Sequence, residues 1–190
     1  MGKRHKVLAI SGSTRKNSTN EIILKTIASL FPDTLELVLY NRIDELPHFN
    51  PDLEKDGLPP PSVAVFRRLI EAAEGVLICT PEYVFSLPGA LKNALEWTVS
   101  TTIFSFKPLA FIVASASGEK AFESLDLIMK TLLQEPVNEQ CKLLIKGGRG
   151  KIDAKGQLAD IHTLNEIKKM ISAFVAIMGD KAFGLNKSFP

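Results

Sequence analysis

The sequence has no long hydrophobic run and carries little net charge. A membrane-spanning helix needs roughly 20 consecutive apolar residues, and no stretch approaches that length, so we expect no membrane span. The apolar run Val7–Ile10 is shorter than a signal-peptide core, which predicts a cytoplasmic protein. A formal net charge of +2 is too small to indicate binding to nucleic acid or to an anionic membrane surface.

Cysteine and histidine are also scarce, with two and three residues respectively. Cys79 and Cys141 each lie within an apolar run, which favours buried reduced thiols over a disulfide. His5, His48 and His162 are scattered and lack the spacing of metal ligands, so no metal site is expected. No Ser-His-Asp set can be placed from the sequence, and hydrolysis therefore has no support.

Short apolar runs alternate with amphipathic stretches along the 190 residues. This alternation is typical of βαβ units around a parallel sheet. Hydrophobic residues make up 45% of the chain and charged residues 23%, as in ordinary globular proteins. We therefore expect residues 1–190 to form a single α/β domain.

The pattern predicts five strands and five helices. The strands are expected at 7–10, 35–40, 76–79, 109–114 and 141–145, and the helices at 19–30, from 62 onward, 88–100, 120–133 and 162–178. Ser62 is expected to cap the second helix and Gly75 to end it. The proline-rich segment 41–62 connects the second strand to the second helix, and it either covers a ligand or crosses the surface.

Right-handed crossovers restrict the topology of such a chain to a few arrangements. The common strand order 2-1-3-4-5 gives a doubly wound, five-stranded parallel sheet with helices on both faces. In this order the ligand crevice lies beyond the carboxyl ends of strands one and three. We therefore look for function in the loops 11–20, 81–86 and 115–118.

The loop after the first strand has the composition of an anion site. Its residues 12–20, GSTRKNSTN, combine four hydroxyls and Arg15 just before a helix N-terminus, where free backbone N–H groups attract phosphate. The loop matches neither the dinucleotide fingerprint nor the P-loop, so a phosphate monoester is the expected ligand. An equally good reading from composition is that Ser18 or Thr19 caps the helix and that Arg15 is a surface charge.

The loop after the third strand, residues 81–89, has the sequence PEYVFSLPG. Its prolines stiffen it, and its exposed backbone amides could hydrogen-bond one edge of a flat heterocycle. Tyr83 or Phe85 could supply an apolar face. In the helix behind this loop, Leu91, Ala94 and Trp97 more often serve as core or subunit contacts than as cofactor ligands.

These two loops together resemble the NADPH-dependent FMN reductase family, which includes related quinone, azo-dye and chromate reductases. The first block is Gly12-Ser13-x-Arg15-x-x-Ser18-x-Asn20. The second begins Pro81-Glu82-Tyr83-x-x-Ser86-x-Pro88-Gly89 and continues x-Leu91-Lys92-Asn93-Ala94-x-x-Trp97. Both occur in order after the expected strands, and the likeness spans nearly the whole chain.

The resemblance implies a flavodoxin-like fold that binds FMN, with NADPH or NADH as co-substrate. It also implies homodimers that often pair into tetramers, with the flavin near the subunit boundary. No catalytic side chain is expected, because the chemistry takes place at N5 of the FMN. The cofactor-binding residues that it implies are Ser11, Ser13, Arg15, Ser18, Thr19 and Asn20 around the phosphate, Pro81, Glu82, Tyr83, Val84 and Ser86 at the ring, and Ser115, Ser117 and Gly118 near the ribityl chain.

Two positions depart from the family pattern. Val84 stands where the family commonly has asparagine, and Glu119-Lys120-Ala121 follows Gly118 in place of a glycine-rich run. The predicted function is transfer of hydride and electrons from NAD(P)H through FMN to a quinone, flavin, azo or metal-oxyanion acceptor. The alternatives are a non-enzymatic FMN-binding electron carrier, a flavin-dependent regulator, or a binding module that has lost FMN.

Overall fold

The computed structural model describes residues 4–54 and 57–184. Its elements follow one another in the order β1 (His5–Ser11), α1 (Thr19–Leu30), β2 (Leu35–Tyr40), α2 (Pro61–Ala72), β3 (Gly75–Thr80), α3 (Gly89–Glu96), β4 (Leu109–Ser115), α4 (Glu119–Leu133), β5 (Lys142–Lys146) and α5 (Ile161–Gly184). The 3₁₀ turns η1 (Ile43–Glu45), η2 (Pro51–Leu53), η3 (Glu139–Cys141) and η4 (Gly148–Lys151) lie in the connections.

The five strands form one parallel sheet in the order β2-β1-β3-β4-β5, which confirms the predicted topology. Leu8 pairs with Val38 of β2 on one side and with Val76 of β3 on the other. Every residue of β3 is buried, as a strand covered on both faces requires. The continuous apolar runs of the sequence therefore mark the centre of the sheet.

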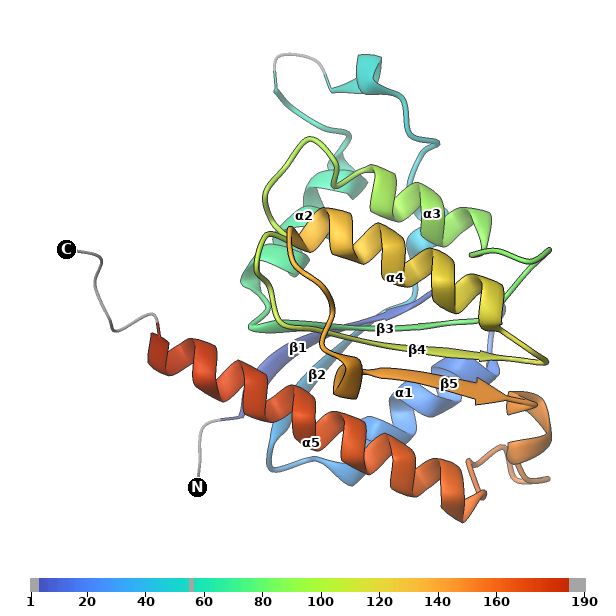
Figure 1. The fold of residues 1–190 in the computed structure, drawn as a ribbon. Helices are drawn as coiled ribbons and strands as arrows, with labels where there is room; N and C mark the ends of the chain where they lie inside the picture. The colour runs from blue at the N-terminus through green and yellow to red at the C-terminus, as the bar shows by residue number, and fades with distance from the viewer. Residues whose placement is uncertain (1–3, 55–56, 185–190) are drawn as a thin grey trace.

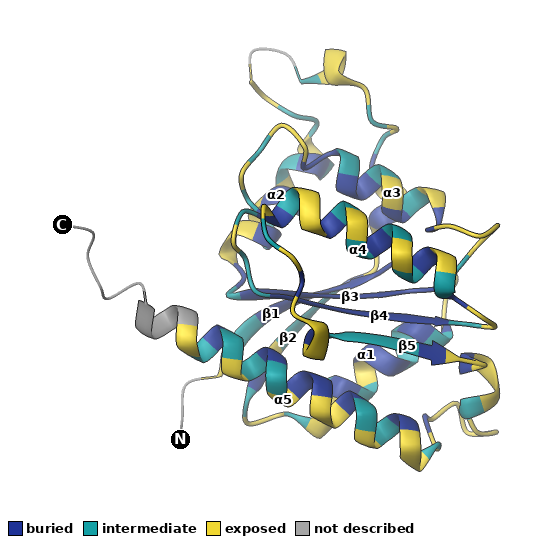
Figure 2. Cartoon of the chain, in the orientation of Figure 1, coloured by how far each residue is buried: buried dark blue, intermediate teal, exposed yellow. Residues whose placement is uncertain are grey.

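Helices cover both faces of the sheet. In Figure 1, α2, α3 and α4 lie on one face and α1 and α5 on the other. Figure 2 shows that the sides of these helices that face the strands are buried and that the outward sides are exposed. Ile23, Leu24 and Ile27 form the buried side of α1. The fold is thus the doubly wound α/β arrangement that the sequence predicts.

The second helix begins and ends differently from the prediction. Ser62 does not cap it, because the helix starts at Pro61 and Pro60 takes the N-cap position without a side-chain hydrogen bond. Proline suits the first helical turn, since it has no N–H to leave unsatisfied there. The helix ends at Ala72, and Gly75 is the first residue of β3 rather than a helix stop.

The third helix is shorter than the predicted 88–100, because α3 ends at Glu96. The carbonyl of Trp97 accepts a hydrogen bond of 2.7 Å from Nε of Arg67 instead of extending the helix. The hydroxyls of Thr98 and Thr101 also donate to nearby backbone carbonyls, at 2.7 Å each. Side-chain bonds of this kind compete with helical backbone bonds.

The proline-rich segment is fastened to α3. The carbonyl of Pro47 accepts hydrogen bonds from the side chains of Trp97, at 2.7 Å, and Asn93, at 3.0 Å. Oδ1 of Asn93 in turn accepts the backbone N–H of Phe49 at 2.7 Å. Asn93 and Trp97, two residues of the family motif, therefore hold this segment in place and do not line the crevice loops.

The far end of the same segment is held by an ion pair. The guanidinium of Arg67 makes two hydrogen bonds to the carboxylate of Glu54, at 2.7 and 3.1 Å, and one to the hydroxyl of Ser100, at 2.9 Å. Arg67 is only 9% exposed. Of the two predicted readings for this segment, the one in which it crosses the surface fits these contacts.

Candidate cofactor site

Three strand-to-helix loops meet at the carboxyl edge of the sheet. They follow β1, β3 and β4, and the strand register brings Ser11 beside Cys79 and Thr80 beside Val113. Because the strands are parallel, their carboxyl ends lie at the same edge. The three segments that the sequence singles out are therefore brought together.

The first loop is packed tightly against β3. The N–H of Gly12 donates to the carbonyl of Cys79 at 2.8 Å. The buried hydroxyl of Ser11 donates to the carbonyl of Ser13 at 3.1 Å, and the hydroxyl of Ser13 accepts the N–H of Arg15 at 3.4 Å. Ser11 and Ser13 thus shape the loop through their own hydrogen bonds.

Gly12 is the point of closest approach in this loop. A Cβ at this position would lie 2.2 Å from Oγ1 and 2.5 Å from Cβ of Thr80, which is fully buried. Real Cβ atoms do not come so close to other heavy atoms, and Thr80 has no room to move. Only glycine lets the first loop lie against the end of β3.

The N-terminus of α1 has a side-chain cap and free backbone donors. The hydroxyl of Ser18 accepts the N–H of Glu21 at 3.1 Å, and the carboxylate of Glu21 accepts the N–H of Asn17 at 3.1 Å. No acceptor within residues 4–54 and 57–184 takes the N–H of Thr19 or Asn20. These donors and the helix dipole suit an anion.

The polar side chains of this loop point to different surroundings. Arg15 is exposed, whereas Ser18 and Asn20 are buried. Oδ1 of Asn20 lies 3.3 Å from Sγ of Cys79, so its carboxamide joins α1 to β3. Burial raises the pKa of the Cys79 thiol, which keeps it protonated. Arg15 and the neighbouring Lys16, which is also exposed, are thus the cations of this loop that solvent or a ligand can reach.

The second loop forms a tight hairpin. Tyr83 and Ser86 exchange two backbone hydrogen bonds of 3.0 and 3.1 Å, and Val84 and Phe85 occupy the tip. The amides of Tyr83 and Ser86 are therefore used within the loop. Of the backbone amides that the sequence offers to a flat heterocycle, those of Glu82, Val84 and Phe85 have no acceptor in the described part of the chain.

Glu82 joins the second loop to the third. One of its carboxylate oxygens accepts the N–H of Ala121 at 3.0 Å, and the other lies 3.4 Å from the hydroxyl of Ser117. The hydroxyl of Ser115 lies 3.5 Å from the Glu82 carbonyl, at the limit of a hydrogen bond. Glu82 therefore caps the first turn of α4 from a neighbouring loop.

Gly118 makes the third loop short. Its φ is +95°, in the left-handed region, and a Cβ there would lie 2.9 Å from Cδ1 of Leu144. Helix α4 begins at the next residue, Glu119. The departure Glu119-Lys120-Ala121 from the family pattern thus forms the first turn of a helix, and the Glu82 carboxylate takes one of its N–H groups.

We predict that Glu82→Ala lowers the free energy of unfolding by about 1 kcal/mol, the usual loss for a removed helix cap. The variant leaves the N–H of Ala121 without its acceptor. The measurement is equilibrium unfolding in urea. As a matched control, Glu123→Ala removes an exposed carboxylate that pairs with Lys120 on the same helix, and it should change stability by a few tenths of a kcal/mol. Equal stability of the Glu82→Ala variant and the wild type would contradict the cap.

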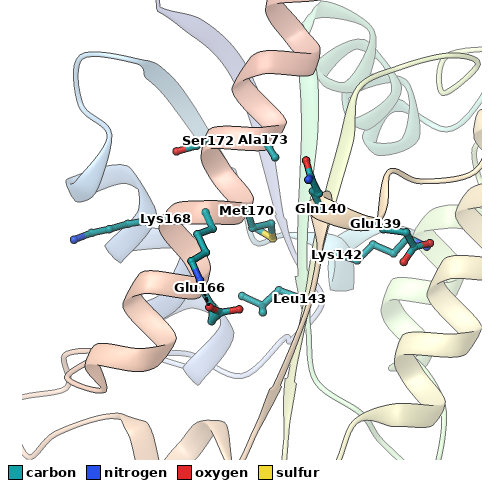
Figure 3. A pocket seen from close by; sticks show the side chains of 10 residues that line it. Glu139, Gln140, Lys142, Leu143, Glu166, Lys168, Met170, Ser172 and Ala173 are labelled. Carbon is teal, nitrogen blue, oxygen red and sulfur yellow. Dashed lines mark hydrogen bonds and ion pairs between the residues drawn. The ribbon is translucent and has the colours of Figure 1, made fainter.

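A hollow of about 690 Å³ lies elsewhere, between α5 and the start of β5 (Figure 3). Its walls include Lys142 and Leu143 from β5 and Glu166 and Met170 from α5. The amine of Lys142 lies 2.8 Å from Asp126 and 2.7 Å from Glu139, so its charge is already paired. This hollow is not near the three crevice loops, and we do not assign the cofactor to it.

Sequence reasoning missed the structural roles of Thr80, which abuts Gly12, and of Glu82, which caps α4. Neither role leaves a local sequence signal, because each joins segments that are distant in the chain.

Within residues 4–54 and 57–184 no group of three or more His, Cys, Asp or Glu could hold a metal ion. Over the same residues, no helix combines the length and the apolar character needed to cross a membrane.

The parallel sheet in the order 2-1-3-4-5, with three loops at its carboxyl edge, defines a flavodoxin-like protein. Residues 5–137 match the NADPH-dependent FMN reductase family. An NAD(P)H-dependent FMN reductase of Pseudomonas aeruginosa is 34% identical over 173 residues, which are 88% of this chain and 92% of that protein. A quinone reductase of Escherichia coli K12 is 34% identical over 182 residues, which are 92% and 95% of the two chains.

Among solved structures, FerB, a flavoenzyme NAD(P)H:(acceptor) oxidoreductase from Paracoccus denitrificans, superposes with a TM-score of 0.74. It is 28% identical, and the match covers 93% of this chain and 98% of that one. The chain belongs to the NADPH-dependent FMN reductase family. The predicted enzyme class, FMN as cofactor and NAD(P)H as co-substrate are thereby confirmed, and membership weighs against a carrier, a regulator or a module without FMN.

Proposed function

We propose that this protein oxidises NAD(P)H and passes the electrons, through FMN held at the carboxyl edge of the sheet, to a small-molecule acceptor. The observation that carries the proposal is that three family loops meet at one edge of the sheet, where the N–H groups of Thr19 and Asn20 at the start of α1 have no acceptor in the described part of the chain. The acceptor classes are those that the sequence predicts: a quinone, a flavin, an azo compound or a metal oxyanion. The quinone reductase of Escherichia coli supports the first of them.

The residues present fit a phosphate monoester. The N–H groups of Thr19 and Asn20 are free to donate, and the exposed guanidinium of Arg15 can add a charged hydrogen bond. Ser13 and Ser18 accept backbone hydrogen bonds, yet each hydroxyl still has a proton to donate. When bound, FMN supplies the hydride and electron transfer.

The chain's own contribution at the ring is to bind and to orient. The free N–H groups of Glu82, Val84 and Phe85 are the backbone donors that this loop can offer to negative charge on a reduced ring system. Tyr83, half exposed, offers an apolar face beside them. Pro81, Ser86, Ser115, Ser117 and Gly118 complete the proposed ring and ribityl contacts.

The experiment begins with the absorbance spectrum of the pure protein after FMN is added and the excess removed. A flavin spectrum that bleaches rapidly on anaerobic mixing with NADPH, and returns when a quinone is added, is the expected result. Initial rates should give parallel double-reciprocal lines, because reductant and acceptor use the same space in turn. A colourless protein that cannot be reconstituted, or a bound flavin that NADPH fails to bleach, would overturn the proposal.

Arg15→Ala should weaken FMN binding by about tenfold to a hundredfold, the equivalent of one charged hydrogen bond to phosphate. The measurement is quenching of flavin fluorescence on titration with apoprotein. Riboflavin provides the control, since it lacks the phosphate and its affinity should not change. Arg68→Ala, which removes another exposed arginine, should leave both affinities unchanged. An unaltered FMN affinity in Arg15→Ala would end the role assigned to Arg15.

We also propose that the protein forms a homodimer through a groove between α3 and α4. This groove of about 440 Å³ is mainly apolar, with Leu95, Val99, Leu127 and Ile128 among its lining residues. Val99 and Leu127 are 62% and 69% exposed, so the isolated chain leaves them in water. A second copy related by a two-fold axis would cover them, and dimers could pair further into tetramers.

Leu127→Glu should shift the protein towards monomers, because it places a charge in the apolar groove. We expect the dimer dissociation constant to rise by about a hundredfold or more, corresponding to about 3 kcal/mol. Sedimentation velocity over a concentration series measures it. Ile161→Glu, on the opposite face of the sheet, changes an equally exposed residue and should leave the assembly unchanged. A Leu127→Glu variant that stays dimeric would refute this interface.

We further propose that residues 1–190 act as one FMN-binding domain in the cytoplasm. Both cysteines are free and buried, as a reducing compartment allows. Burial raises the pKa of the Cys141 thiol to about 11, so it stays protonated at neutral pH.

A further inference from the structure

The tip of the second loop has an unfavourable backbone conformation. Val84 has a φ of +50° and Phe85 a φ of +58°, so both central residues of the Tyr83–Ser86 hairpin have a left-handed backbone conformation. A two-residue hairpin turn with this geometry strongly prefers Asn-Gly. A β-branched residue in the left-handed region is a genuine outlier, and this turn contains one.

Folding gains little from these two side chains. Val84 is 94% exposed and Phe85 78% exposed, so neither buries much apolar surface. The left-handed conformation costs roughly 1–2 kcal/mol for each residue other than glycine. Neither packing nor turn preference accounts for Val-Phe here. Strained residues of this kind gather at ligand sites, where the surroundings hold them in place.

The hairpin has a firm base at the edge of the crevice. It follows β3, and the carboxylate of Glu82 accepts the N–H of Ala121 at its base. On its other side the chain returns through Leu87 and Pro88, which are both buried. The two tip side chains carry no charge. The hairpin therefore presents a rigid apolar surface beside the proposed flavin site.

We infer that Val84 and Phe85 form an apolar tip that contacts the electron acceptor and favours flat, uncharged rings over hydrated anions. This inference rests on the proposed function and adds to it the residues that select the acceptor. An aromatic ring can pack against the Phe85 side chain and release water from both surfaces. A hydrated anion gains nothing from such a surface, because it would lose solvation without finding a donor.

The first test measures binding without turnover. Air-oxidised holoprotein is titrated calorimetrically with duroquinone in the absence of nicotinamide, so that both flavin and quinone are oxidised and no electron transfer occurs. The Val84→Asn/Phe85→Gly double variant should bind duroquinone at least about tenfold more weakly, the loss expected for an apolar side chain that no longer covers its ligand. The same variant should melt at a higher temperature than the wild type, because Asn-Gly relaxes the turn. Phe85→Tyr, which keeps the ring, should retain duroquinone affinity.

Phe106→Gly is a matched control for the loss of the phenyl ring. Phe106 also has a left-handed φ, +56°, and is 57% exposed. It precedes β4, so it lies at the opposite edge of the sheet from Phe85. Phe106→Gly should leave the duroquinone affinity unchanged. A similar loss in both variants would mean that the effect is not local to the tip.

Steady-state kinetics separate selectivity from general damage. In a Phe85→Gly variant, which leaves Val84 in place, the KM for duroquinone should rise about tenfold, while the KM for ferricyanide, an anionic acceptor, should stay within about twofold. Unchanged duroquinone binding in the double variant would overturn the inference. A wild-type protein that binds FMN yet is not reduced by NADPH would instead refute the proposed function, and the duroquinone titration would still test the tip.

Discussion

Gly12→Ala is expected to lower the free energy of unfolding by about 2–3 kcal/mol, in the upper part of the range of about 1–3 kcal/mol for an overpacked core position. The added methyl group would lie 2.2 Å from Oγ1 of Thr80, and neither segment can retreat. The N–H of Gly12 also donates to the Cys79 carbonyl at 2.8 Å, and this hydrogen bond must lengthen. FMN binding should weaken by at least about tenfold, because a small displacement of binding groups is enough to lose a charged hydrogen bond.

Urea unfolding and FMN titration measure the two effects of Gly12→Ala. The matched control is Gly89→Ala, because a Cβ at Gly89 meets no atom within 4 Å. It should be neutral or slightly stabilising, since alanine is the better helix former. Removing the clashing side chain should relieve the strain, so the Gly12→Ala/Thr80→Gly double variant should lose less stability than the sum of the single changes. Strict additivity of the two changes would contradict the proposed clash.

Arg67→Met is expected to lower the free energy of unfolding by about 2–3 kcal/mol, because it breaks a largely buried charge cluster. The variant removes both hydrogen bonds to Glu54 and the one to the Trp97 carbonyl. Methionine keeps most of the side-chain volume, so the loss reports the hydrogen bonds more than a cavity. Thermal or urea unfolding gives the size of the effect.

The loss in the free energy of unfolding caused by Arg67→Met should depend on pH. Hydrogen bonds from Arg67 hold the pKa of Glu54 below its ordinary value of 4.5, and one with Ser100 adds to this effect. A carboxyl group whose pKa is lower in the folded state stabilises the fold above its unfolded pKa. That stability disappears as the pH falls through the folded pKa. The stability gap between wild type and Arg67→Met should therefore be full at neutral pH and narrow below about pH 4.5.

Arg68→Met serves as the control for Arg67→Met. Arg68 is the next residue on α2 and is exposed, so its loss should change stability by less than about 0.5 kcal/mol at any of these pH values. Glu54→Gln removes the titrating group and should abolish the narrowing at low pH. A gap that stays constant from neutral to acidic pH would show that the ion pair does not supply the stability.

The sequence predicted the architecture well because its signals are local. Continuous apolar runs marked the buried strands, and the predicted bounds of α1 and β2 agree with the structure. The other strands differ by one or two residues at their ends, and α5 continues to Gly184. The position at which a helix ends depends on whether its last backbone carbonyls accept hydrogen bonds from donors outside the helix. Trp97 illustrates this, since its carbonyl is taken by Arg67, which is distant in the sequence.

The candidate site was predicted in part. Its three loops were identified, since parallel strands must end at the same edge, and the resemblance named their residues. The proposed contacts of those residues with FMN stay predictions. The local sequence pattern could not predict the hydrogen-bond partners of the side chains in these loops. Ser18 turned out to cap α1, as one of the two readings of that loop holds, and Asn20 faces Cys79.

By itself, the sequence determined the order of strands and helices, the strand order of the sheet and the family of reductases to which the chain belongs. These follow from hydrophobic period, crossover handedness and short motifs, which act over a few neighbouring residues. Only the tertiary structure decided that Gly12 must lack a side chain, that Glu82 caps a distant helix and that Val84 and Phe85 stand strained and exposed at a tip. These features depend on atoms from separate segments meeting in space, and the one-dimensional pattern does not encode those distances.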